Sequence, residues 1–163
     1  MKKLALFLGV CMLFGLTGSL FAEEADPRIE YQLKRMDVQY EINDSGAFRI
    51  IFDTSDDDED ERTQLVIVGS VTESIGALEV REIWSCGYRV PEGEAVSASV
   101  IKKAAMESNQ YIIGAWELIN DEMLIFCAKV PANLDDDTLR SIIVSVGRQA
   151  DKFEQATLGT DDL

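Results

Sequence analysis

Residues 135–153, DDDTLRSIIVSVGRQADKF, predict a long amphipathic helix near the C-terminus. The apolar residues recur at spacings of three and four, which places them on one stripe of a helix: Leu139, Ile142, Ile143, Val146, Ala150 and Phe153. Asp135 is a suitable N-cap, and the two aspartates after it complement the positive end of the helix dipole. Gly147 costs about 1 kcal/mol relative to alanine inside a helix. Its presence indicates close packing of this helix against a sheet.

Two shorter helices are predicted upstream. Asp26 followed by Pro27 is a typical helix start, and apolar residues at positions 29, 33 and 36 continue with helical spacing. The second helix is expected to open at Pro91 and to run over residues 93–108, with Asn109 at its end.

Alternating apolar residues predict strands between these helices. One hairpin joins residues 38–42 to 48–52 through a turn that ends at Gly46, where a positive φ suits glycine. Further strands are predicted at the following places: 65–68, 80–86 after a loop containing Gly76, and a hairpin of 115–119 with 123–130 across Asn120 and Asp121. Strand runs punctuated by helices are typical of the α+β class. We therefore expect an antiparallel sheet of about five to six strands flanked by three helices.

The first 22 residues have the features of an export signal. Lys2 and Lys3 precede an apolar stretch, and small residues lead to Ala22, a suitable cleavage point. Two other interpretations are an uncleaved anchor, since residues 4–22 are just long enough to span a bilayer, and lipidation at Cys11. The bulky Val10 before Cys11 disfavours lipidation. We expect a signal peptide at 1–22 and a periplasmic or secreted domain at 23–163, with an acidic loop at 54–61 and a frayed tail at 158–163.

The composition excludes several classes of function. The chain has 15 Lys and Arg against 30 Asp and Glu, a net charge of −15, and removal of residues 1–22 would take away two positive charges. This balance repels nucleic acid and anionic lipid head groups, so neither a nucleic acid nor, after cleavage, a membrane is an expected partner. The chain contains no histidine, which excludes Ser-His and Cys-His nucleophile pairs and two-histidine zinc sites.

After signal removal two cysteines remain, Cys86 and Cys127. They are too few for a cysteine-only zinc site. In an oxidising compartment they could form one disulfide, and the alternative is two free thiols packed inside separate strands.

The acidic run is the most evident candidate for a metal site. Asp56, Asp58 and Asp60 match the first three ligand positions of a calcium loop. The match then fails, because Glu61 stands where that loop needs glycine and Ile67 stands where it needs a bidentate glutamate. We expect a solvated loop and no metal.

Aromatic residues and carboxylates are the remaining candidates. Trp84, Tyr88 and Trp116 could line a binding surface, together with Tyr111 and Phe126, although aromatics inside strands more often belong to the core. Paired carboxylates could support glycosidase-type hydrolysis, but in so acidic a chain proximity of two acids has almost no specificity. We expect a protein that is not an enzyme, with no catalytic residue and no cofactor.

Several motifs resemble those of the YbjN-like family, the bacterial sensory transduction regulators. They are GAFR at 46–49, YRVP at 88–91, Asn109 followed by GAWEL at 114–118, FCAKVPANL at 126–134, and Thr138-Leu139 through DKF at 151–153. The resemblance covers roughly residues 28–154. It implies a fold similar to type III secretion chaperones, frequent homodimerisation, no cofactor and no catalytic residues.

Members of that family are usually cytoplasmic, whereas this chain carries a predicted signal. We therefore expect an exported, non-enzymatic binding or chaperone-like protein whose partner is another envelope protein. The alternatives are a module that senses a small molecule or cation and, less favoured, a carboxylate-dependent hydrolase.

Overall fold

The computed structural model describes residues 24–54 and 62–158. The predicted signal at 1–22, the calcium candidates Asp56, Asp58 and Asp60, and the tail beyond residue 158 lie outside this range. The described elements follow one another in this order: α1 (Pro27–Arg35), β1 (Glu41–Ile42), β2 (Phe48–Asp53), β3 (Thr63–Ile75), β4 (Leu78–Arg89), α2 (Ala98–Ser108), β5 (Ala115–Ile119), β6 (Met123–Pro131) and α3 (Asp136–Thr157).

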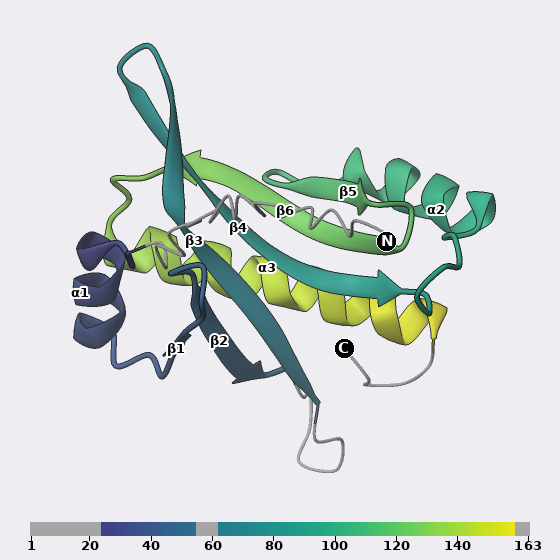
Figure 1. Cartoon of the computed structure of the whole chain (residues 1–163), viewed down its shortest axis with the longest axis horizontal. Helices are drawn as coiled ribbons and strands as arrows, with labels where there is room; N and C mark the ends of the chain where they lie inside the picture. The colour runs from purple at the N-terminus through teal and green to yellow at the C-terminus, as the bar shows by residue number, and fades with distance from the viewer. Residues whose placement is uncertain (1–23, 55–61, 159–163) are drawn as a thin grey trace, which may run out of the picture.

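The six strands form one antiparallel sheet in the order β1-β2-β3-β4-β6-β5 (Figure 1). All three helices contribute buried residues to a single core on one side of it, with α3 behind β3, β4 and β6 in Figure 1. The predicted α+β class, with about five to six strands and three helices, is confirmed. Among the helices of the described residues, none is long and apolar enough to cross a lipid bilayer.

The C-terminal helix has the form that its sequence predicts. Asp135 caps α3, its carboxylate accepting the Thr138 N–H at 2.8 Å, and all six residues of the predicted stripe are buried. Asp26 likewise caps α1 by accepting the Arg28 N–H at 2.9 Å, with Ile29 and Leu33 on the buried side.

The second helix begins later than predicted. The prediction placed its start at residue 93, but α2 starts at Ala98, after the N-cap Ser97. Gly93 has a φ of +83°, and the Val96 N–H donates to the Asp121 carbonyl at 2.7 Å. Residues 91–96 therefore dock on the β5–β6 turn as a loop, because a tertiary backbone hydrogen bond replaces the helical one. The predicted end at Asn109 is confirmed.

Two strand lengths also differ from the prediction. Strand β3 extends from Thr63 to Ile75, well beyond the predicted 65–68, because its polar outer half pairs with β4 across the Gly76–Ala77 turn. Strand β1 is only two residues long, not five. The Val38 N–H donates to the Leu33 carbonyl, so the residues after α1 close the helix end before any strand can form. The predicted turn at Asn120 and Asp121 is confirmed, with φ values of 51° and 60° that suit a tight hairpin.

Gly147 is packed closely against side chains of the sheet. A Cβ atom at this position would lie 2.1 Å from Cζ of Phe52 and 3.0 Å from Cγ2 of Val66. The close packing expected from a glycine inside a helix is thereby confirmed.

Substituting Gly147 with alanine should therefore destabilise the protein despite the better helix propensity of alanine. Overpacking costs about 1–3 kcal/mol, against a propensity gain of about 1 kcal/mol. In urea unfolding, the double variant Gly147→Ala with Phe52→Leu should lose less stability than the sum of the two single variants. If the stability losses of the two single variants were strictly additive, Phe52 would not be the residue that the alanine methyl group clashes with.

Candidate functional site

One face of the sheet is not covered by any helix of the described residues. Strand register assigns the faces, because directly opposed residues in antiparallel strands point the same way and neighbours along a strand alternate. One row across the sheet points to the core: Phe48, Val68, Ile83 and Ala128. The adjacent row points the other way: Arg49, Ile67, Trp84 and Cys127. We call this second side the open face, and it is turned toward the viewer in Figure 1.

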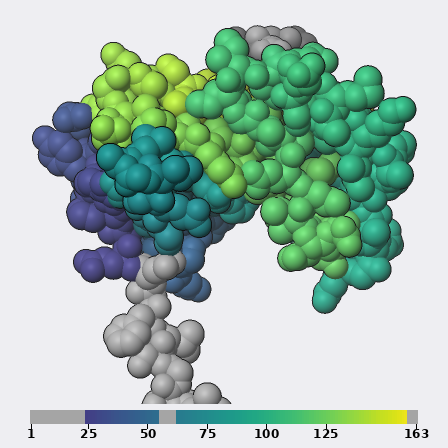
Figure 2. Space-filling model, turned by 90° about the horizontal axis from the view of Figure 1, so that it is seen from above, coloured from purple at the N-terminus to yellow at the C-terminus, as the bar shows by residue number. Residues whose placement is uncertain are grey.

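A groove of about 290 Å³ lies on the open face. It is located where β3 and β4 extend out of the body of the sheet as a hairpin, beside the turn that joins β1 to β2. Its lining comprises an apolar group of Ile67, Val71, Val80 and Trp84 and a charged group of Glu73, Glu82 and Lys129. Figure 2 shows the molecule hollowed on this side, between the β3–β4 hairpin and the residues around the β5–β6 turn.

The charged side chains of the open face are mostly acidic. Lys129 Nζ lies 3.0 Å from Glu82 Oε1 and 3.5 Å from Glu117 Oε1. The hydrogen bond to Glu82 and the charge of Glu117 raise the pKa of Lys129. Glu73 lines the same groove and makes no ion pair within residues 24–54 and 62–158. The groove therefore has more negative than positive charge.

A β-bulge directs the hairpin away from the rest of the sheet. The pairing of β3 with β4 shifts register between Val68 and Thr72. The Arg81 guanidinium, only 1% exposed, fills this irregularity and donates to the carbonyls of Gly69 and Ser70. A bulge bends its strand and increases the local twist. The wall of the groove thus depends on a buried cation.

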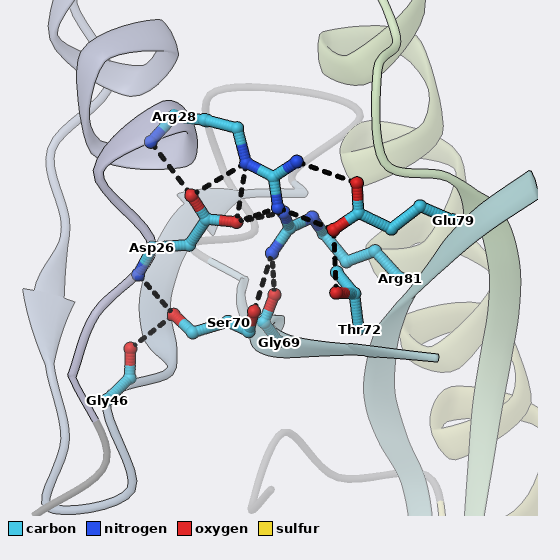
Figure 3. A network of polar contacts seen from close by, with 8 residues as sticks. All are labelled: Asp26, Arg28, Gly46, Gly69, Ser70, Thr72, Glu79 and Arg81. Atoms are coloured by element: carbon cyan, nitrogen blue, oxygen red, sulfur yellow. Dashed lines mark hydrogen bonds and ion pairs between the residues drawn. The ribbon is translucent and has the colours of Figure 1, made fainter. Parts of the chain in front are cut away.

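Arg81 is neutralised by a carboxylate from another part of the chain. Its Nη2 atom lies 2.5 Å from Oδ2 of Asp26, the N-cap of α1 (Figure 3). Burial by itself would raise the pKa of Asp26, but hydrogen bonds from Arg28 and Arg81 outweigh it and hold that pKa well below its usual range.

The network continues to the hairpin through Arg28. Its guanidinium donates to both carboxylate oxygens of Glu79, at 2.7 and 2.8 Å. Hydrogen bonds from Arg28 and then Thr72 lower the pKa of Glu79 to about 2. One network of ion pairs and hydrogen bonds therefore joins the start of α1, the bulge and the hairpin.

The three aromatic residues predicted as a binding surface do not lie together. Trp84 is on the open face and lines the groove. Trp116, 9% exposed, belongs to the core, where its ring packs on Phe126 and Phe153. Tyr88 is partly buried against the same core. Sequence pattern alone does not separate Trp84 from Trp116, because both occur inside alternating strands.

Cys86 and Cys127 both carry free thiols. Strand register explains why the disulfide considered above is absent: Cys86 is opposite Ile125, and Cys127 is opposite Trp84. The two cysteines are thus diagonal neighbours, about 7–8 Å apart in such sheets, beyond the usual Cα separation of a disulfide. Burial raises the pKa of both thiols, that of Cys127 to about 12.

Two observations on the described residues bear on metal binding and on acid–base chemistry. No group of three or more Cys, Asp or Glu side chains there is arranged to hold a metal ion. The pKa is shifted downward at five carboxyls of the described residues: Asp26, Glu30, Glu79, Asp135 and Asp136. A general acid needs a raised pKa, so none of these five is suited to that role.

Comparisons with protein-family models and with curated proteins find no match to this chain. The functional argument therefore rests on the groove and its charges. Sequence reasoning named Trp84 but missed Glu73, Glu82, Lys129 and the Asp26–Arg81 pair. A signal for Arg81 did exist, since it is the one cation within the predicted strand 80–86.

Asp26→Asn tests the charge network. Asparagine still caps α1, but Arg81 is left buried without its counter-ion, which should cost about 3–5 kcal/mol at neutral pH. Because the folded-state pKa of Asp26 is depressed, this stability is present above the unfolded pKa of about 4 and is lost as the pH falls toward the folded value. The free energies of unfolding of wild type and variant in urea should therefore begin to approach each other only below about pH 4 and should keep converging as the pH falls further.

Glu30→Gln is the matched control, because Glu30 is also an acid of the α1 region but pairs with the exposed Lys34 and accepts a hydrogen bond from the Tyr40 hydroxyl, with no buried cation as partner within the described ranges. This substitution should lower the free energy of unfolding far less than Asp26→Asn does. An equal loss for Asp26→Asn at every pH would contradict the role given to its charge.

The thiols allow a second test at this site. In the native protein at mildly alkaline pH, Cys127 should resist a thiol-specific reagent, since it is buried and its pKa is about 12. Cys86, which is partly exposed, should react faster, and both should react in denaturant. Mass spectrometry counts the modified residues. A native protein without free thiols even in denaturant would contradict the register of β4 and β6.

Proposed function

We propose that the protein is an exported, non-enzymatic binding protein that holds a segment of another envelope protein on its open face, in the manner of a chaperone. The observation that carries this proposal is the groove around Trp84 on a sheet face that no described helix covers. Export is inferred from residues 1–22, and the resemblance to the YbjN-like family adds support for a binding role.

Apolar side chains on the open face support the proposal. Four large apolar residues are substantially exposed on β2 and the β3–β4 hairpin: Ile51, Val71, Ile75 and Leu78. The register Ile75↔Leu78 and the alternation along both strands put the hairpin residues on the same side as Val80 and Trp84. Ile51 is opposite Leu65, near the other end of β3, so the exposed apolar patch is that of the hairpin. Such patches mark interaction sites, and a tryptophan next to one is a typical anchor.

A small cationic ligand is the second candidate, because the groove combines an aromatic ring with carboxylates. Cations bind over aromatic faces, most favourably over tryptophan. The groove is, however, at the lower end of the size of small-molecule sites. A thermal-shift screen separates the two candidates, since a specific small ligand must raise the melting temperature by mass action.

The proposal predicts a position-specific crosslink in cells. A photoreactive amino acid in place of Trp84 should capture one envelope protein, identified by sequence and able to form the complex again when purified. The same group in place of Arg148, exposed on α3 away from the open face, should not capture it. Fractionation and intact mass should find the protein outside the cytoplasm without residues 1–22. Retention in the cytoplasm, or equal capture from both positions, would refute the proposal.

A further inference from the structure

The charged residues that line the groove are two acids, Glu73 and Glu82, and one base, Lys129. Along β3 and β4, acids alternate with apolar residues on the open face, so that Glu73 and Glu82 flank Val71, Val80 and Trp84. The side chains of Glu82 and Lys129 are each about half exposed, 54% and 56%, so their ion pair is accessible to a competing charge. Glu73 is exposed and has no cationic partner in the described part of the chain.

Charge also limits which occupant this surface can take. A second copy of the chain would bring its own Glu73 and Glu82 against the same acids, and the whole chain has a net charge of −15. Like charges placed opposite each other across an interface cost several kcal/mol. An anionic lipid surface is disfavoured for the same reason. A positively charged partner is instead attracted by Glu73, by Glu82 and by the net negative charge of the chain.

We propose that the groove binds an extended, cationic segment of a protein partner, in which apolar residues alternate with lysine or arginine. This inference rests on the proposed function and adds the chemistry of the partner. An apolar side chain of the segment packs on Trp84 and Ile67, while neighbouring cations reach Glu73 and Glu82. The β3–β4 hairpin forms one wall of the site.

The spacing of the groove fits such a segment. In an extended chain, side chains on the same side recur about every 7 Å, which is also the repeat of Glu82 and Trp84 along β4. The apolar contacts supply most of the affinity, as buried aromatic anchors do at interfaces. The acids supply selectivity and a faster, salt-dependent association.

Lys129 has a particular role in this arrangement. Its ammonium group already forms ion pairs with Glu82 and Glu117 at the groove. A cation of the partner must compete with it. Removing the Lys129 charge should therefore tighten the binding of a cationic segment, which is opposite to the usual effect of deleting a charged residue from a binding site.

Two synthetic peptides test the inference. Both have ten residues with leucine at alternate positions; one has lysine at the others and its twin has glutamate. Binding to the purified protein is followed by NMR of the two tryptophan indole N–H groups. The Trp84 signal should shift with the lysine peptide while that of the buried Trp116 stays unchanged. The glutamate twin should bind at least tenfold more weakly, and high salt should weaken the lysine peptide.

Matched variants identify the groups involved. The double substitution Glu73→Gln and Glu82→Gln should weaken the lysine peptide about tenfold, given the usual strength of exposed charge pairs. Glu92→Gln with Glu94→Gln removes the same charge outside the groove and should leave the affinity unchanged. Lys129→Gln should tighten the binding several-fold, and Trp84→Ala should weaken it at least tenfold.

Specific outcomes would overturn the inference. They are equal affinity for both peptides, weaker binding by Lys129→Gln, or binding of lysine amide as tight as that of the lysine peptide. A partner captured at position 84 through a neutral or acidic segment would also overturn it while leaving the proposed function intact. Failure to capture any envelope protein at position 84 bears instead on the proposed function.

Discussion

The buried guanidinium of Arg81 is the constraint on which the rest of the structure depends. A charge taken out of water is costly unless it is paired and its hydrogen bonds are made. Arg81 pairs its two terminal nitrogens with Asp26, which precedes α1, and with the carbonyls of the β3 bulge; only its Nε is left without a partner among the described residues. Asp26 is 55 residues from Arg81 in the chain. If either segment moved, the guanidinium would be exposed to water or would lose its counter-ion. One side chain thereby fixes the start of the first helix, the bulge and the hairpin relative to one another.

The same constraint produces the surface on which the functional proposals rest. With a regular ladder, β3 and β4 would continue in the plane of the sheet. The bulge held by Arg81 bends them instead, so their apolar and acidic residues form a wall beside Trp84. Meanwhile the three helices gather on the opposite side, where Gly147 lets α3 approach the sheet closely. The open face is therefore the direct result of placing the whole core on one side. The buried core is thus concentrated on the helix side, and the proposed binding surface is on the other.

Local signals in the sequence predicted much of the fold but little of the site. Helix α3 and the turn at Asn120 and Asp121 were predictable because capping, periodicity and turn geometry act within a few residues. The start of α2 was not, because Val96 bonds to Asp121, 25 residues away. The outer half of β3 looks like a polar loop until β4 pairs with it. Trp84 and Trp116 have the same strand-like surroundings in sequence, yet the sheet places them on opposite sides.

The sequence by itself determined the class of elements, their approximate order, the acidic charge and the absence of histidine chemistry. These properties follow from composition and from interactions between near neighbours. Tertiary structure alone decided which face of the sheet stays open, that Arg81 pairs with Asp26, and that Glu73, Glu82 and Lys129 meet around Trp84. Each of these depends on strand register, and a shift of one residue would send every side chain of a strand to the other face. Register is set by contacts between distant segments, which is why the groove emerges only in the folded chain.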